Sequence, residues 1–113
     1  MAHASIASLR GMCGGPRDGA LLRVSLANAL LADGDAATAI AEIRHALNFD
    51  PDYSAAWKLL GRTLADAGDA AAAIDAYRAG INAANKRGDK QAEKEMRVFL
   101  RRVEKGRGDP AAS

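Results

Sequence analysis

The 113-residue chain has few of the residues that build sheets, disulfides or membrane spans. It contains five aromatic residues, three prolines and one cysteine. A single thiol excludes an intramolecular disulfide and is typical of a reducing compartment. Residues with high strand propensity form no alternating run, which argues against a sheet. No apolar run approaches the ~18 residues of a membrane-spanning helix or forms the core of a secretion signal, so we expect a soluble, cytoplasmic protein with no membrane partner.

Alanine and charge dominate what is present. The 27 alanines favour helices that approach one another closely, because each side chain buries little apolar area. The net charge is only +2, but residues 86–107 hold nine Lys or Arg against four Asp or Glu. A basic end on a mildly acidic remainder is a candidate binding surface.

An internal repeat with a period of 34 residues relates residues 20–53 to residues 54–87. Each unit predicts two helices joined by a tight turn, because a glycine ends the first helix and the following aspartate caps the second. The repeated positions expected to face a core or to form a turn are Leu26, Ala27, Leu30, Gly34, Ala39 and Pro51 in the first unit, and Trp57, Leu60, Gly61, Leu64, Gly68, Ala73, Tyr77 and Gly80 in the second.

Two glycines, Gly61 and Gly80, fall inside predicted helices. Glycine costs roughly 1 kcal/mol relative to alanine in a helix interior. We therefore expect another helix to cross at each of these positions, where only a small side chain fits.

The flanking segments complete the predicted organisation. Residues 1–16 predict a short helix followed by a Gly/Pro linker, and residues 17–105 form the main domain. Residues 89–105 predict an amphipathic helix that covers the end of the second repeat. Residues 106–113, which contain two glycines and a proline, are expected to form a flexible tail.

The repeat resembles the tetratricopeptide repeat family, in which each unit is a helix–turn–helix. The second unit has the family's large residue at Trp57 and its aromatic at Tyr77. The first unit departs from the pattern, with Arg23 and Ile43 at these two places, and Asn85 replaces the proline that closes a unit. The resemblance implies an all-α, right-handed stack of helix–turn–helix repeats, an α-solenoid fragment of about six helices in which residues 89–105 form a capping helix.

The resemblance also implies a protein-binding adaptor, in which the first helices of the units line a concave groove for a peptide or helix of a partner. The candidate partner-binding residues are Asn28, Lys58, Arg62 and Arg97. The alternative for these residues is a solvated helix face. Some family members grip a C-terminal carboxylate with a set of Lys, Asn and Arg residues. Only Asn28 matches that set here, because Val24 and Leu59 stand where polar groups would be needed, so that activity is not predicted.

Two other functions stay open at this point. The flanking helices could make the chain a self-associating assembly element, possible as a homodimer. The basic C-terminal helix could bind RNA or a ribosome through phosphates, although no aromatic residue on its polar face is available for base stacking. The chain has no phosphate-binding glycine loop, no nucleophile elbow and no metal-ligand spacing around its two histidines. We therefore expect no enzyme, no cofactor and no metal.

Overall fold

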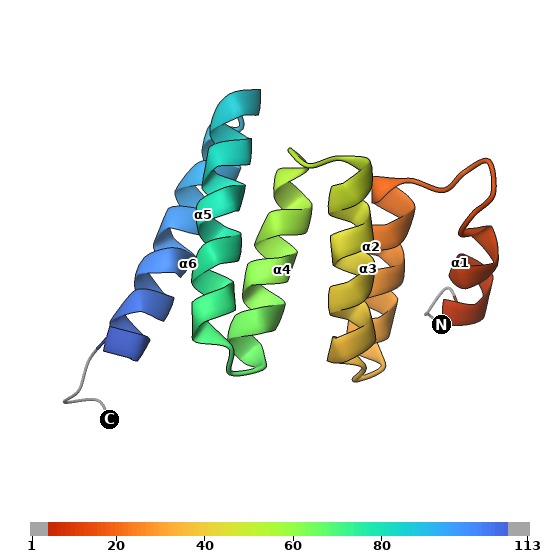
Figure 1. Cartoon of the computed structure of the whole chain (residues 1–113), viewed down its shortest axis with the longest axis horizontal. Helices are drawn as coiled ribbons and strands as arrows, with labels where there is room; N and C mark the ends of the chain where they lie inside the picture. Colours follow the sequence, from red (N-terminus) through yellow and green to blue (C-terminus); the bar gives the residue numbers. More distant parts are fainter. Residues whose placement is uncertain (1–4, 109–113) are drawn as a thin grey trace. The chain divides into compact units, whose positions relative to one another are not determined.

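The computed structural model describes residues 5–108, and within that range it contains six α-helices and no strand. The chain divides into two compact units, with the boundary between Pro51 and Asp52. The first unit holds α1 (Ile6–Met12), α2 (Ala20–Ala32) and α3 (Ala36–Phe49); the second holds α4 (Ser54–Asp66), α5 (Ala70–Arg87) and α6 (Lys90–Gly108) (Figure 1). The predicted all-α helix–turn–helix repeat fold is confirmed.

The turns that join α2 to α3, α4 to α5 and α5 to α6 share one hydrogen-bonding pattern. Gly34 has a φ of +83°, and the backbone N–H of the next residue, Asp35, donates to the carbonyl of Leu30 at 2.9 Å. This arrangement satisfies carbonyls at the end of α2 and needs a left-handed residue, which glycine adopts without a steric penalty. The same pattern recurs at Gly68-Asp69 and at Gly88-Asp89.

The aspartates in these turns also begin the following helices. The side chain of Asp35 accepts a hydrogen bond from the backbone N–H of Thr38 at 3.1 Å. Asp69 and Asp89 accept equivalent bonds, each at 3.1 Å, from residues three positions later. Each aspartate therefore helps to end one helix and caps the next, which allows a connection of only two or three residues.

The core of the first unit lies between α2 and α3, and α1 packs against α2. Leu26 and Ala27 of α2 are fully buried, as are Ala39 and Ile43 of α3. Leu30 is also buried, whereas Pro51, which follows the end of α3, is exposed. The small Ala residues at the contact allow the two helices of the pair to approach closely.

The core of the second unit lies among α4, α5 and α6, with α5 in contact with both of its neighbours (Figure 1). Its buried cluster consists of Tyr77, Ile81, Ala84, Ala92 and Met96, and Trp57, Phe99, Leu100 and Val103 pack against it half-buried. The aromatic rings of Tyr77 and Phe99 stack with centroids 5.9 Å apart. Leu60, Leu64 and Ala73, which the repeat pattern singles out, are buried as well.

The close helix contacts expected at the two helical glycines are present. A Cβ on Gly80 would lie 2.5 Å from Sδ of Met96 on α6 and 2.6 Å from Cβ of Trp57 on α4. A Cβ on Gly61 would meet the ring of Tyr77. Both glycines therefore allow neighbouring helices to approach more closely than an alanine would.

The last helix ends later than the sequence predicts. Asp89 caps α6 as expected, but the helix continues through Gly108, three residues beyond the predicted end at residue 105. A glycine in a helix costs only about 1 kcal/mol, and the strong stop signal, Pro110, comes later. Part of the predicted tail, residues 109–113, lies outside the described residues, as do residues 1–4 of the predicted N-terminal segment.

Candidate functional site

The four predicted partner-binding residues are divided between the two units. Asn28 is exposed on α2 of the first unit, whereas Lys58 and Arg62 lie on α4 and Arg97 lies on α6 of the second. Within the second unit, the structure brings Lys58 to α6, but it gives Arg97 a different set of contacts.

Lys58 forms an ion pair between α4 and α6. Its Nζ donates a hydrogen bond to Oε1 of Glu95 at 2.8 Å. Both side chains are about two-fifths exposed, at 38% and 40%. The hydrogen bond from Lys58 lowers the pKa of the Glu95 carboxyl, so this carboxylate is ionised at neutral pH. The predicted cation is therefore accessible to a partner, but it already has a carboxylate beside it.

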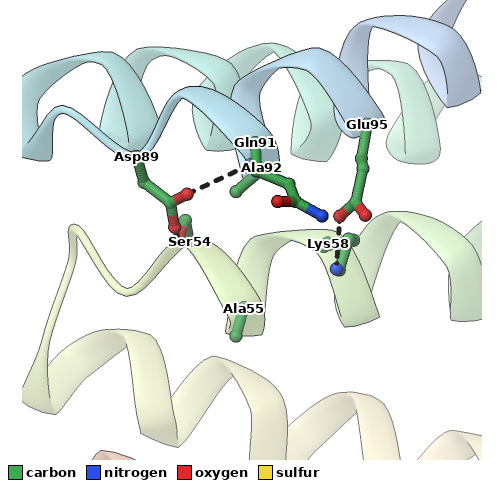
Figure 2. Close-up of a pocket in the computed structure, with 7 residues that line it drawn as sticks. All are labelled: Ser54, Ala55, Lys58, Asp89, Gln91, Ala92 and Glu95. Carbon is green, nitrogen blue, oxygen red and sulfur yellow. Dashed lines mark hydrogen bonds and ion pairs between the residues drawn. The ribbon is translucent and has the colours of Figure 1, made fainter.

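A surface pocket of about 340 Å³ lies at this ion pair, between the N-terminal halves of α4 and α6 (Figure 2). It is lined by Ser54, Ala55, Lys58, Asp89, Gln91, Ala92 and Glu95. At its far end the Ser54 hydroxyl donates to Oδ2 of Asp89 at 3.1 Å, while the other oxygen of this carboxylate caps α6. The pocket thus combines fixed polar groups at one end with a half-exposed ion pair at the other.

Arg62 lies one helical turn after Lys58 and so on the same face of α4. It is exposed, and it makes no hydrogen bond or ion pair with any residue of the described range. Its guanidinium is therefore available to a carboxylate of a partner.

Arg97 does not line the pocket. It makes an ion pair with Glu93 on its own helix at 2.7 Å, and Glu93 also accepts a hydrogen bond from Nδ2 of Asn85 on α5 at 3.4 Å. Arg97 follows Glu95 by two positions, so the two side chains leave α6 in directions about 160° apart. The residues of α6 that line the pocket with Lys58 are instead Gln91 and Glu95, which no repeat position or motif marks in the sequence.

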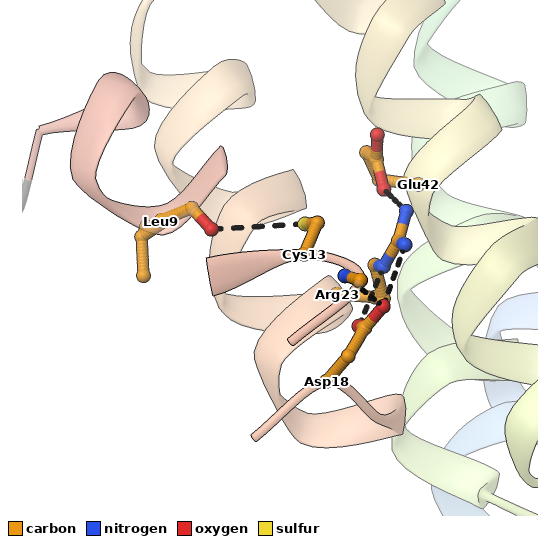
Figure 3. Close-up of polar contacts among 6 residues, drawn as sticks. Leu9, Cys13, Asp18, Arg23 and Glu42 are labelled. Carbon is orange, nitrogen blue, oxygen red and sulfur yellow. Dashed lines mark hydrogen bonds and ion pairs between the residues drawn. The ribbon is translucent and has the colours of Figure 1, made fainter. Parts of the chain in front are cut away.

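A buried polar network in the first unit was also missed. Arg23 donates two hydrogen bonds to the carboxylate of Asp18, at 2.8 and 2.9 Å, and a third to Glu42 of α3 at 2.8 Å (Figure 3). The three side chains are only 9–14% exposed. The hydrogen bonds from Arg23 and from the backbone N–H of Gly14 hold the pKa of Asp18 far below its usual range.

The signal for this network was the departure of Arg23 from the repeat pattern. Arg23 stands 34 residues before Trp57, at the position of the large apolar residue. Its guanidinium also lies 6.0 Å from the ring centroid of Phe49 at the end of α3. The arginine therefore ties the segment before α2 to α3 by charge, where the second unit uses apolar packing.

Neither a metal-binding cluster nor a membrane-spanning helix is found in the described residues. No group of three or more His, Cys, Asp or Glu side chains in residues 5–108 is arranged to hold a metal ion. Across the same range, every helix is too short or too polar to cross a membrane. Cys13 is half-buried, and its thiol lies 3.6 Å from the carbonyl of Leu9 within the same short segment (Figure 3).

Comparisons with known proteins agree with this architecture. The family model described as tetratricopeptide repeat matches residues 20–63. TPR repeat-containing protein PA0015 from Pseudomonas aeruginosa is 48% identical over 90 residues, which cover 80% of this chain and 86% of that protein. The solution structure of protein BPP2914 from Bordetella parapertussis is 42% identical, with a TM-score of 0.77 over 94% of this chain and 93% of the other.

Tetratricopeptide repeats generally mediate interactions between proteins, and proteins of this family are typically scaffolds without catalytic activity. The repeat period, the paired helices and the similarity to PA0015 over most of both chains lead to one conclusion: this chain belongs to the tetratricopeptide repeat family.

Proposed function

We propose that the chain is a protein-interaction module that binds an extended or helical segment of a partner across α4 and the N-terminal half of α6. The observation that carries this proposal is the pocket between these two helices, with the half-exposed pair of Lys58 and Glu95 at one end. No enzymatic step is part of the proposal.

The chemistry of the pocket suits a peptide with both polar and charged groups. The side-chain amide of Gln91 offers a donor and an acceptor, and the carboxylate of Glu95 and the ammonium of Lys58 can each exchange their mutual contact for one with a partner. Arg62, one turn of α4 beyond Lys58, would pair with a second carboxylate of the bound partner segment. Asn28 does not line this pocket and stays a separate proposed contact on the first unit, and Gln91 and Glu95 take the place of Arg97.

An exposed ion pair is a suitable binding element because its exchange costs little. Pairs at this exposure contribute weakly to folding, since water and salt screen them. A partner that replaces one half of the pair therefore gains a contact without destabilising the scaffold.

The proposal can be tested with peptides selected from a display library against the purified full chain. Affinities are then compared for the wild type, for Lys58→Gln/Arg62→Gln, and for Arg10→Gln/Arg44→Gln, a control pair of exposed residues in the first unit with the same charge change. We expect at least about tenfold weaker binding for the pocket variant and wild-type affinity for the control.

The binding surface is checked by NMR chemical-shift mapping with the selected peptide. Perturbed amides should cluster at Ser54, Lys58, Gln91 and Glu95. Equal binding by all three proteins, or perturbations confined to other helices, would refute the proposed surface. Selection of no peptide, together with concentration-dependent mass of the chain alone, would favour self-association instead.

A further inference from the structure

A second charged surface lies on α6, on the side of the helix away from the core. Five cations recur along it at intervals of three or four residues: Lys90, Lys94, Arg97, Arg101 and Lys105. All five are exposed, and helical geometry places them within about 80° of one another over a length of about 22 Å. We call these five residues the basic stripe.

The basic stripe is separate from the surfaces already described. The side chains of α6 that pack on the core, among them Ala92, Met96 and Val103, leave the helix on the opposite side. Glu95, which belongs to the pocket, also points away from the stripe. A partner could therefore occupy the stripe without displacing the core or filling the pocket.

Most of the charge on the stripe is not neutralised by other side chains of residues 5–108. In the described range, Lys90, Lys94, Arg101 and Lys105 make no ion pair or hydrogen bond through their side chains. Among the contacts of the described residues, Arg97 alone of the five has an ion-pair partner, Glu93, at 2.7 Å. These four like charges on one face of a helix repel one another weakly, and a row of carboxylates would relieve that repulsion.

We propose that the basic stripe docks an acidic helical segment of a partner protein, with Asp or Glu residues repeated every three or four positions. Such a segment presents carboxylates about 5–6 Å apart along its axis, which is the spacing of the cations on the stripe. Each carboxylate can then face one lysine or arginine. The stripe bears no aromatic residue that would anchor a base, since Phe99 stacks on Tyr77 in the core.

The carboxylates beside the stripe favour discrete charges on the partner over a continuous phosphate backbone. Glu93 borders the stripe near one end and Glu104 near the other, where it pairs with Arg78 of α5 at 3.0 Å. A nucleic acid duplex lying along the helix would bring phosphates close to both carboxylates. An acidic helix can place its carboxylates between these two positions, opposite the cations.

The test uses two alanine-based peptides of about 20 residues with the same composition. One carries glutamates every three or four residues on a single helix face, and the other carries them scattered around the helix. Binding to the full chain is measured at about 50 mM salt and again at about 300 mM, because contacts between exposed charges weaken as screening increases. A DNA duplex of about 20 base pairs is measured in parallel.

The variants separate the stripe from general electrostatic attraction. Lys94→Gln/Arg101→Gln removes two charges of the stripe, whereas Arg10→Gln/Arg44→Gln removes two exposed charges from the first unit. We expect the patterned peptide to bind the wild type and the control equally, and the stripe variant about tenfold more weakly. Lys58→Gln/Arg62→Gln should retain wild-type affinity for this peptide, which distinguishes the stripe from the pocket.

Three results would overturn the inference. The first is no detectable binding of the patterned peptide at low salt. The second is equal binding of both peptides with equal weakening by the two charge variants, which would indicate attraction by net charge alone. The third is stripe-dependent binding of the duplex that is tighter than binding of the patterned peptide, which would assign the surface to a nucleic acid.

Discussion

The ring of Tyr77 on α5 lies against the backbone of Gly61 on α4 so closely that a Cβ at residue 61 would be 2.5 Å from Cε1 of the ring. The ring cannot swing away easily, because Tyr77 is 2% exposed and its ring stacks on that of Phe99. The helix pair of the second repeat therefore depends on a residue without a side chain.

This contact predicts that Gly61→Ala destabilises the protein, although alanine is the better helix former. We expect a loss of about 1–3 kcal/mol in the free energy of unfolding, because overpacking outweighs the gain of roughly 1 kcal/mol in helix propensity. Gly106→Ala in α6 is the control, since nothing lies within 4 Å of a Cβ there. In urea unfolding, Gly106→Ala should leave the free energy of unfolding unchanged or raise it slightly. Equal stabilisation by Gly61→Ala and Gly106→Ala would contradict the close contact at Gly61.

Gly68, in the turn between α4 and α5, predicts a second case in which replacing a glycine lowers the free energy of unfolding. Gly68 has a φ of +88°, a conformation that costs an L-residue about 1–2 kcal/mol, so Gly68→Ala should lower the free energy of unfolding by that amount. Gly68→Asn should lower it less, because asparagine tolerates this region better. Gly19→Ala, at an extended glycine with no atom within 4 Å of its Cβ, should change it by less than about 0.5 kcal/mol.

The network of Arg23 predicts how stability depends on pH. The folded state lowers the pKa of Asp18 far below the ordinary value of about 3.9, so Asp18 stabilises the fold above that value. Its contribution is lost as the pH falls, because the unfolded chain takes up a proton that the folded chain does not. Urea midpoints measured from about pH 7 down to about pH 3 should therefore decline in acid for the wild type, and less steeply for Asp18→Asn.

Asp75→Asn supplies the control for this experiment. Asp75 is exposed on α5 and makes no ion pair in the described part of the chain. Its substitution should leave the acid-dependent decline as in the wild type. A decline that is the same for Asp18→Asn as for the wild type would show that the contact of Asp18 with Arg23 does not stabilise the fold.

The pair of Lys58 and Glu95 predicts a small effect on folding. Both side chains are about two-fifths exposed, so solvent screens their attraction. We expect the melting temperatures of Lys58→Gln and Glu95→Gln to stay close to that of the wild type, well within the change caused by Gly61→Ala. A large loss in either variant would make the pair a structural contact and would argue against its role as an exchangeable binding element.

Local signals made the helices of this chain predictable. Each turn joins a glycine, an aspartate and carbonyls no more than five residues away, as at Gly34, Asp35 and Leu30. The same short pattern at residues 68–69 gave the register of the repeat and, with it, the family. The end of α6 was the exception, because glycine is a weak stop in a helix whose other residues favour it.

Contacts of charged side chains could not be predicted in the same way. The sequence places Lys58 on the first helix of the second repeat and Arg97 on the helix that follows this repeat. It does not specify how α6 is rotated about its axis relative to α4. That rotation puts Glu95 beside Lys58 at 2.8 Å and directs Arg97 to Glu93 instead. The contacts of Arg23 were equally unpredictable. The repeat pattern marks Arg23 as a departure, but its ion-pair partners Asp18 and Glu42 come from a loop and from a second helix.

The sequence by itself determined the number of helices, most of their ends and the repeat family, because caps, turns and apolar periodicity act over a few residues. Only the tertiary structure decided which charged side chains meet. Those contacts depend on the rotation and spacing of packed helices, which many buried side chains set together, with Gly61 and Gly80 among them.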